Sequence, residues 1–599
     1  MSASLAHRGP DDANEFISDH VSLAYRRLAI IDREGGNQPI FNEDRTKVIV
    51  YNGEVYNYRE LRERLKGKHF FDTNSDTEVI IHLYEELGEA AFTELNGMFA
   101  FAIYDSAQDK LVLARDRFGI KPLFYAIEDG MLFFASEIKA LLHRIRPEPN
   151  DGQIYDYLAY RLHDHNEETF FAGIRRLLPG TYLTYQAGEV NVERYWEPTF
   201  DEAADEVDED ELNERFERLF VDSVRSQLVG EVPIGSCLSG GLDSSAIVAT
   251  INGLLGEDIP EREVIGERQK TFSAVFPGEV NDETAYIDRL TDGLAVEKHS
   301  ILPQDADLWP ELERIVYHQD EPFVSTGIFA QWEVMKAASK EVTVVLDGQG
   351  ADELLAGYTP YQFVYLRQLW KERRLFRLAK ELVLSLDILF FAALERIKVR
   401  LRLSKSVDPK TLLDPAFAER SERPPPELCT DDLNQRLWED ITTYSLPSLL
   451  RYEDRNSMAF SIESRVPFLD NELVDLILSL PPSFKIKNGW SKAILRRSLR
   501  DYLPDKIRHR RWKVGFTMPE VAWLRREKDN VLEVFESPQF RSRGYVDAGR
   551  VVEAFRWFVE GKTSSSLVFW RILNLELWFR VFFDGDANER FGVDHAERG

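Results

Sequence analysis

Two patterns of apolar residues divide the chain. Before residue 200, short apolar runs alternate with turn residues, which is typical of strands in a layered, β-rich domain. These runs cover residues 28–31, 48–51, 99–104, 111–114 and 131–135. The segment Ser75-Asp76-Thr77-Glu78 has the pattern of a capping box, which predicts a helix through Leu87 that ends at Gly88. The first part of the chain is therefore predicted to be an α+β domain.

A second pattern begins after an acidic run at 201–211, which suits a linker or a solvated helix start. An amphipathic helix that opens near residue 208 is predicted by apolar residues at helical spacing, namely Leu212, Phe216, Leu219, Phe220, Val224 and Leu228. Apolar runs at 232–238, 271–276 and 342–346 then alternate with helical patterns, which predicts a parallel sheet with helices on both faces. Helical patterns dominate after this sheet. We therefore expect one domain at 1–200 and a second at 208–599.

The segment Ser239–Ser245 connects the first of these strands to a helix. Its two glycines let the backbone turn tightly and approach a ligand. The N–H groups of the loop and of the following helix would bind phosphate, and Asp243 would hold a divalent cation there. A Walker loop ends in Gly-Lys-Ser/Thr and this loop has no lysine, so it resembles the pyrophosphate loop of ATP pyrophosphatases instead. A plain glycine-rich turn is the alternative.

A second polar loop, Asp347–Glu353, follows the apolar run at 342–346. Because the carboxyl ends of parallel strands meet at one crevice, this loop should face Ser239–Ser245. Its carboxylates would supply a further oxygen ligand for Mg²⁺, with an acidic turn before a helix as the alternative. The basic segment at 496–513 suits a nucleotide enzyme with one phosphate-facing lysine better than it suits a nucleic-acid patch.

Composition narrows the function further. The formal net charge of −29 at pH 7 argues against a protein whose main partner is nucleic acid or an anionic membrane. The two cysteines, Cys237 and Cys429, fit a reducing cytosol. The apolar stretch 382–394 is interrupted by Asp387 and is too short to span a bilayer, so a packed helix is predicted, with an interfacial helix as the alternative. We expect a cytoplasmic protein.

Ordered sequence blocks in both halves resemble the glutamine-dependent asparagine synthetase family. The blocks are Arg8–Asp12, Tyr51–Asn57, Ser75–Glu78 and Ala114–Leu123 in the first half, and Ser239–Ser245, Gly348–Tyr358, Arg455–Asp470 and Arg511–Phe516 in the second. The resemblance implies a class II glutaminase domain of the N-terminal-nucleophile fold, followed by an α/β ATP pyrophosphatase domain with a helical C-terminal part. It implies adenylation of the aspartate side chain and transfer of ammonia, which gives asparagine, AMP and pyrophosphate.

The resemblance also assigns roles to individual residues of the second half. It makes Asp243 and Asp352 catalytic ligands of Mg²⁺ and pyrophosphate, and Lys513 the charge that stabilises the pentavalent phosphorus. Residues implied to bind ATP and pyrophosphate are Leu238, Ser239, Gly240, Gly241, Asp243, Ser244, Ser245, Val275 and Gly348.

In the first half, the resemblance implies a glutamine site. Arg27 would bind the α-carboxylate of glutamine, Glu54 and Asp76 its α-amino group, and Asn52 with the Gly53 amide the oxyanion. A guanidinium fork fits a carboxylate, and donors aimed at an oxyanion lower the barrier to acyl transfer. For Asp76 there is an alternative, since a carboxylate in the first turn also favours a helix N-terminus.

Two features depart from the family pattern. The glutaminase of the family uses a cysteine at the mature N-terminus, whereas this sequence begins Met1-Ser2-Ala3. Two explanations compete: the sequence is truncated at its start, or the glutaminase activity is lost and the domain is kept as a scaffold, as in some relatives. Truncation is favoured because the glutamine-binding set is intact, and the sequence as it stands is expected to use free ammonia and not to hydrolyse glutamine. In addition, Gln349 stands where well-known asparagine synthetases carry a glutamate that takes a proton from ammonia, and a neutral amide is no base.

Three functions follow as hypotheses. The first is synthesis of asparagine from aspartate, ATP and ammonia or glutamine. The second is formation of another amide, on the carboxylate of a secondary metabolite or a surface polysaccharide. The third is a non-catalytic interaction protein, against which the intact Ser239–Ser245, Asp352 and Lys513 count. Assembly as a homodimer is left open.

Overall fold

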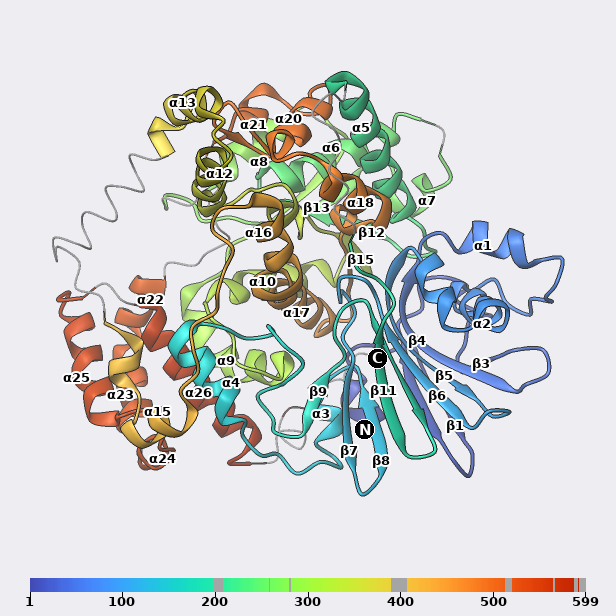
Figure 1. Ribbon diagram of the computed structural model, residues 1–599, viewed down its shortest axis with the longest axis horizontal. Coiled ribbons are helices and arrows are strands. Elements are labelled where there is room, and N and C mark those ends of the chain that lie inside the picture. The colour runs from blue at the N-terminus through green and yellow to red at the C-terminus, as the bar shows by residue number, and fades with distance from the viewer. Residues whose placement is uncertain are drawn as a thin grey trace.

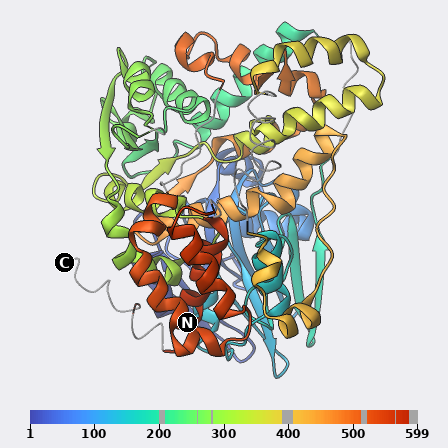
Figure 2. The ribbon, with the colours of Figure 1, turned by 90° about the vertical axis from the view of Figure 1, so that its left-hand side faces the viewer.

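The computed structural model describes residues 1–198, 208–257, 259–279, 282–388, 407–511, 520–563, 566–585 and 591. Lys513, most of the acidic run and the end of the apolar stretch 382–394 lie outside these ranges. Figure 1 shows the strands of the first half at the lower right, with the helices of the second half above and to the left of them. Figure 2 shows that the last helices of the chain form one group.

Antiparallel strands build the first half. The main sheet has six strands in the order β11-β10-β6-β5-β4-β3, a second sheet has the order β8-β7-β9, and β1 pairs with β2. The bounds are β1 (Asp12–Ile17), β2 (Ser22–Arg27), β3 (Ile40–Phe41), β4 (Lys47–Val55), β5 (Gly97–Asp105), β6 (Lys110–Arg115), β7 (Phe124–Glu128), β8 (Met131–Ala135), β9 (Ile174–Arg176), β10 (Thr181–Gln186) and β11 (Glu189–Arg194). The strands predicted at 48–51, 99–104, 111–114 and 131–135 are confirmed.

The strand prediction for residues 28–31 is wrong. β2 ends at Arg27, and the chain continues there without regular structure. The carbonyl of Ile31 accepts a hydrogen bond from the Arg27 guanidinium at 3.0 Å, and the carbonyl of Ile30 accepts one from the N–H of Glu231 at 2.9 Å. The apolar side chains of this run fill the core, while its backbone binds a side chain and the second half instead of a neighbouring strand.

Helix α2 (Asp76–Leu87) begins and ends as its sequence predicts. Ser75 is the N-cap, its hydroxyl accepts the N–H of Thr77 at 3.2 Å, and Gly88 follows the last turn with a φ of 60°. The helix packs against β4 and against α1 (Tyr58–Leu65). Its first residue, Asp76, is buried.

A five-stranded parallel sheet organises the second half, in the order β14-β13-β12-β15-β16. Its strands are β12 (Ile234–Cys237), β13 (Gln269–Ala274), β14 (Val296–Ile301), β15 (Val344–Leu346) and β16 (Glu463–Arg465). Val344 and Leu346 pack in one core with α6 (Leu242–Leu254), and Val345 packs in another with α10 (Gly327–Ala338). Helices therefore cover both faces of the sheet, as predicted.

Helix α5 (Glu209–Ser226) opens this half with Asp208 as its N-cap, and it buries Leu212, Phe216, Phe220 and Val224. The predicted amphipathic helix is thus confirmed. Other helices of this half include α9 (Asp305–Gln319), α12 (Thr359–Lys371), α17 (Leu446–Met458), α18 (Asn471–Ser479), α20 (Ala493–Ser498), α22 (Glu520–Arg526), α23 (Lys528–Glu536), α25 (Ala548–Val559) and α26 (Leu567–Phe582).

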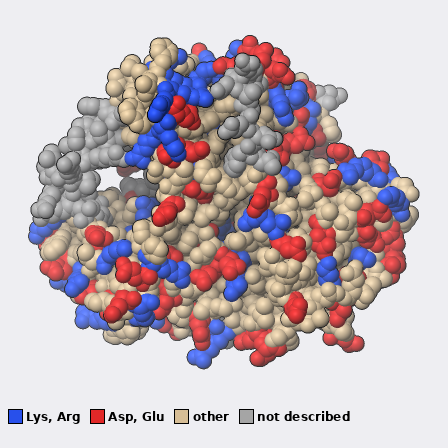
Figure 3. All heavy atoms as spheres, viewed as in Figure 1, with Lys and Arg blue, Asp and Glu red and all other residues tan. Residues whose placement is uncertain are grey.

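The two halves share a hydrophobic core. One continuous cluster contains side chains of the first half, such as Phe101 of β5, together with Phe220 of α5 and Ile247 of α6. Acidic and basic side chains are interspersed over the face that Figure 3 shows. Among the described residues, no helix has both the length and the apolar character needed to cross a membrane.

Candidate active sites

The Ser239–Ser245 loop lies at the carboxyl end of β12, in the middle of the parallel sheet, and leads into α6. Gly240 has a φ of 71°, which side chains disfavour, and Gly241 is the N-cap of α6. The hydroxyl of Ser244 accepts the N–H of Ser239 at 3.1 Å. The predicted strand, loop and helix are confirmed. Backbone N–H groups at the N-terminus of α6 create an environment that favours phosphate.

Lys492 joins the two carboxylates that the sequence assigns to this site. Its Nζ lies 2.6 Å from Oδ2 of Asp243 and 2.7 Å from Oδ1 of Asp352. Burial lowers the pKa of the Lys492 ammonium group, and the charge of Asp243 opposes this effect. The structure therefore brings the loops at Ser239–Ser245 and Asp347–Glu353 together around one buried cation.

Sequence reasoning missed Lys492. It stands directly before α20 as one of 74 lysine and arginine residues, and no motif spacing marks it. The lysine assigned by resemblance, Lys513, lies outside the described residues. A nearby basic residue does reach the loop, since Arg510 donates to the carbonyl of Gly240 at 3.0 Å and pairs with Glu283.

Two glycines permit close packing around these charges. A Cβ on Gly348 would lie 3.1 Å from Cβ of Asp243 and 3.2 Å from N of Ser244. A Cβ on Gly357 would lie 1.7 Å from Oδ1 of Asp352 and 2.4 Å from Cε of Lys492. A side chain at either position would displace the loop or the ion pair.

Leu238 and Val275 lie at the same edge of the sheet as the glycine loop. They directly follow β12 and β13, and their N–H groups bond to Phe272 at 2.9 Å and to Ile301 at 2.8 Å. Ligands of parallel sheets bind at this carboxyl edge. The predicted nucleotide-binding residues within the described chain are thus gathered on one side of the sheet.

Glu453 is a buried carboxyl group of α17 beside Gln349. The Gln349 amide lies 3.5 Å from its Oε2, the Ser464 hydroxyl donates to its Oε1 at 2.6 Å, and the Gln331 amide is a further donor. Burial, followed by repulsion from Asp347, raises the pKa of Glu453 to about 8. Glu453 lies just before the sequence block Arg455–Asp470, and no motif of the sequence gives it a role.

The residues assigned to glutamine line one cavity of about 710 Å³ in the first half, namely Arg27, Asn52, Gly53, Glu54 and Asp76. Asn52 and Gly53 lie on β4, Arg27 ends β2 and Asp76 begins α2. The Nδ2 of Asn52 is buried and has no hydrogen-bond partner in the described structure. An orphan donor in a cavity suits an oxyanion.

Asp76 and Arg27 already have several partners. Oδ2 of Asp76 accepts from the Tyr51 hydroxyl and from the N–H of Val55, both at 2.9 Å, and burial raises the pKa of Asp76. The Arg27 guanidinium donates to the carbonyl of Asp32 and to Asn37 Oδ1, both at 2.7 Å. A ligand carboxylate would have to compete for these donors.

Glu54 connects this cavity to the second half. Its Oε1 lies 3.4 Å from Nη2 of Arg465, on β16, and Arg465 Nε donates to Glu463 at 2.9 Å. Burial, together with the nearby carboxylates Glu463 and Asp76, raises the pKa of Glu54 well above its usual range. The two candidate sites are thereby linked through a strand of the parallel sheet.

Comparisons with known proteins identify the family. Residues 215–580 match the family model for asparagine synthase, and residues 1–196 match that for a glutamine amidotransferase domain. Asparagine synthetase (glutamine-hydrolyzing) 1 of Bacillus subtilis is 32% identical over 610 residues, which cover 97% of this chain and 93% of that protein. A second asparagine synthetase (glutamine-hydrolyzing) of the same species, number 3, is 31% identical over 559 residues, or 89% and 87% of the two chains.

A relative with a different name is amidase chyE of Penicillium rubens, 27% identical over 613 residues, which cover 92% of this chain and 89% of that protein. Family models match both halves, and the similarity to the Bacillus synthetase extends over nearly the whole length. The chain therefore belongs to the asparagine synthase family of ligases that form C–N bonds.

Proposed function

We propose that this ATP-dependent amide ligase adenylates the side-chain carboxylate of aspartate and transfers ammonia to it, giving asparagine, AMP and pyrophosphate. The observation that carries the proposal is the position of Lys492 between Asp243 and Asp352, beside the glycine loop. A preorganised cation at a phosphate-binding loop stabilises the charge that develops in phosphoryl and adenylyl transfer.

In the first step, an oxygen of the aspartate side chain attacks the α-phosphorus of ATP and pyrophosphate leaves, so that an acyl adenylate forms. N–H groups of Gly240 and Gly241 would bind the leaving pyrophosphate. Asp243 and Asp352 fit Mg²⁺, because their carboxylates converge on one cation position and Mg²⁺ prefers oxygen ligands. The Lys492 ammonium group would yield that position to Mg²⁺ and would then be free to pair with the phosphate oxygens. Bound there, Mg²⁺ would supply Lewis-acid stabilisation of the phosphate oxygens.

In the second step, ammonia attacks the carbonyl carbon of the acyl adenylate, AMP leaves, and the nitrogen loses a proton. Gln349 has no basic atom for that proton. Glu453 would accept it, because its carboxylate lies beside Gln349 and has a pKa of about 8. A base with a pKa near the working pH is the most effective proton acceptor.

The proposal is tested by incubating the chain with ATP, Mg²⁺, aspartate and ammonium and measuring asparagine and AMP. The two products should appear in equal amounts. Lys492→Met should slow both by about 10²–10³-fold, the usual effect of removing one group that stabilises transition-state charge. ATP cleavage that does not depend on aspartate would contradict the choice of substrate, and no ATP cleavage with any acid would favour a non-catalytic role.

A second candidate is formation of another amide on the same scaffold. It is favoured by Gln349, since a neutral amide near the nucleotide site departs from the pattern expected for aspartate. An amidase-named relative over most of the chain also supports it. Pyrophosphate release with a panel of other carboxylic acids distinguishes the two candidates, because only the true acyl substrate should accelerate it.

For the first half we propose a glutamine site in the cavity that Arg27, Asn52, Gly53, Glu54 and Asp76 line. Support comes from the orphan Nδ2 of Asn52 and from the carboxylates of Glu54 and Asp76. Calorimetric titration with glutamine should detect binding, and Asp76→Asn should weaken it by at least tenfold. Equal affinity for D-glutamine would contradict a site that binds both the α-carboxylate and the α-amino group, because such a site should distinguish the two enantiomers.

A further inference from the structure

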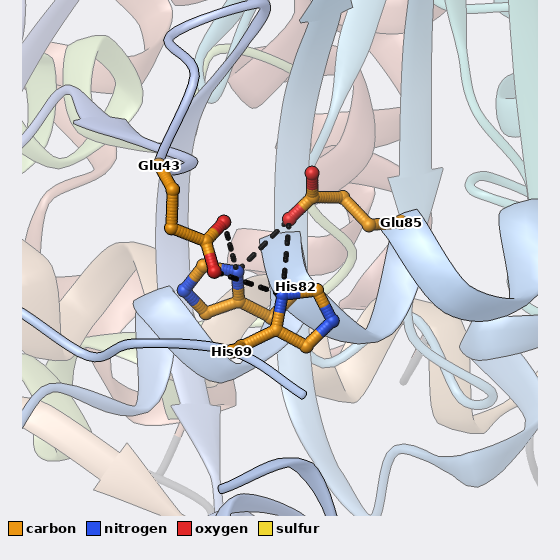
Figure 4. A group of neighbouring side chains, drawn as sticks. All are labelled: Glu43, His69, His82 and Glu85. Atoms are coloured by element: carbon orange, nitrogen blue, oxygen red, sulfur yellow. Dashed lines mark hydrogen bonds and ion pairs between the residues drawn. The ribbon is translucent and has the colours of Figure 1, made fainter. Parts of the chain in front are cut away.

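Four ionisable side chains of the first half form a cluster outside the glutamine cavity. Glu43 follows β3, His69 follows α1, and His82 and Glu85 lie one turn apart on α2. Figure 4 shows the four side chains pointing toward one another. The proposed ligase reaction uses none of them.

The ligand atoms in this cluster all lie within 4.8 Å of one another, close enough to surround one metal ion once the side chains adjust. Nδ1 of His69 lies 3.0 Å from an oxygen of Glu43 and 3.7 Å from one of Glu85. Nδ1 of His82 lies 3.4 Å from Glu43 and 2.9 Å from Glu85. Zn²⁺ with four ligands at about 2.0–2.2 Å separates them by about 3.3–3.6 Å, a range that these four distances bracket. The two imidazole rings stack, with centroids 4.6 Å apart and planes inclined by 28°, so the rings would have to turn for both Nδ1 atoms to reach one ion.

The outer nitrogens of both imidazoles face further carboxylates. Nε2 of His82 lies 3.6 Å from Oε1 of Glu78, and Nε2 of His69 lies 3.3 Å from Oε1 of Glu86. Histidine ligands of metals usually donate their second N–H to a carboxylate, carbonyl or water, which fixes the ring and its tautomer. Here the carboxylates stand on the sides of the rings away from the cluster.

The charge of the cluster favours a dication. Glu43, Glu85, Glu78 and Glu86 carry four negative charges when ionised, whereas the two imidazoles carry at most two positive charges and Lys68, which pairs with Glu86, carries one. At least one negative charge therefore remains, and two remain if one imidazole is neutral. Each Nδ1 faces two carboxylates, although a single N–H donates well to only one acceptor.

We propose that Glu43, His69, His82 and Glu85 form a structural site for Zn²⁺. Two imidazole nitrogens and two carboxylate oxygens in a tetrahedral arrangement suit this ion, and four protein ligands leave no position open for a substrate. The ion ties the turn after β3 and the loop after α1 to α2. It would thereby hold the helix whose first residue, Asp76, lines the glutamine cavity.

The test titrates the full chain, without ATP, with Zn²⁺ in competition with a chromophoric chelator. One equivalent should bind, and X-ray absorption at the zinc edge should report four nitrogen or oxygen ligands at about 2.0–2.2 Å. His69→Gln and Glu43→Gln should weaken binding by at least 100-fold, and Glu86→Gln by about tenfold. Zn²⁺ should raise the Tm of the wild-type chain but not that of His69→Gln.

His20→Gln is the matched control, because His20 also bonds a carboxylate through Nδ1, at 3.0 Å from Asp109, but lies outside the cluster. Asp352→Asn should keep the full zinc equivalent, which excludes binding at the nucleotide site. If His82→Gln fails to fold, His69→Gln and Glu43→Gln still test the proposal, because both residues lie in loops, where a substitution disturbs the fold less. Absence of binding at micromolar Zn²⁺, or unchanged affinity in His69→Gln, would show that protons alone hold the cluster and would overturn the proposal.

Discussion

Glu453 illustrates how an environment prepares one residue for proton transfer. It is fully enclosed, it accepts a hydrogen bond from Ser464, and it lies near a second carboxylate, Asp347. These surroundings favour the neutral acid at pH 7, so that the basic form dominates only above a pH of about 8. The residue therefore holds or releases a proton in the range where the enzyme would work.

Glu453→Gln should separate the two steps of the proposed reaction. Loss of a general base should slow asparagine formation by about 10²-fold, whereas aspartate-dependent exchange of pyrophosphate into ATP should be retained. In the wild type, the rate per concentration of free NH₃ should rise about tenfold from pH 7 to 9, because the carboxylate form increases as the pH passes the pKa. A profile for Glu453→Gln that rises in the same way would assign the proton to another group.

A substitution at Gly357 tests whether the position of Asp352 relative to Lys492 matters for adenylation. A Cβ there would meet Asp352 Oδ1 at 1.7 Å, so Gly357→Ala should push the carboxylate away from the ammonium group. Misplacement of catalytic groups by about 1 Å can cost 10²-fold in rate, and adenylation should fall by roughly this factor without loss of the fold. Gly67→Ala is the control, since a Cβ at Gly67 meets nothing within 4 Å. Normal turnover in Gly357→Ala would show that this ion pair tolerates displacement.

At the level of elements, the sequence predicts what local patterns determine. Capping residues define α2, and turn residues separate the strands of the main sheet. The short strand β16 escapes prediction because its residues Glu463, Ser464 and Arg465 are polar and buried. The apolar run at 28–31 is wrongly predicted to be a strand, because the apolar side chains of a loop can also fill a core. Lys492 meets its carboxylates only through long-range folding, which no local pattern encodes.

The cap of α2 provides a test at this level. Ser75→Ala removes the oxygen that accepts the N–H of Thr77 and a contact of 3.3 Å to Asp76. Loss of a serine N-cap lowers the free energy of unfolding by about 1 kcal/mol, so the midpoint of urea unfolding should decrease in proportion. Ser106→Ala, which removes an exposed hydroxyl bonded to a carbonyl, should change the midpoint by less than about half as much. Equal effects of the two variants would mean that the cap does not stabilise α2.

Over the whole molecule, buried charges as well as apolar side chains join the two halves. Asp454 of α17 accepts two hydrogen bonds from Arg8, at 2.7 and 2.8 Å, and one from Arg455 at 3.0 Å. Glu137 of the first half adds a bond from Arg8 at 2.8 Å. Because apolar clusters with side chains of both halves join them as well, neither half can separate without exposing both apolar surface and unpaired charge.

Asp454→Asn should therefore destabilise the entire chain. It leaves Arg8 and Arg455 buried with one carboxylate fewer, and breaking such a network lowers the free energy of unfolding by about 3–5 kcal/mol.

Asp475→Asn is the matched control. Its carboxylate also pairs across the halves, at 3.3 Å from Arg117, but it is 56% exposed, and exposed pairs contribute at most about 1 kcal/mol. In urea, fluorescence and circular dichroism should report one coincident transition for the wild type and for Asp475→Asn. In Asp454→Asn the midpoint should be lower, or the transition should divide in two. Equally small shifts in both variants would indicate that the shared apolar core alone holds the halves together.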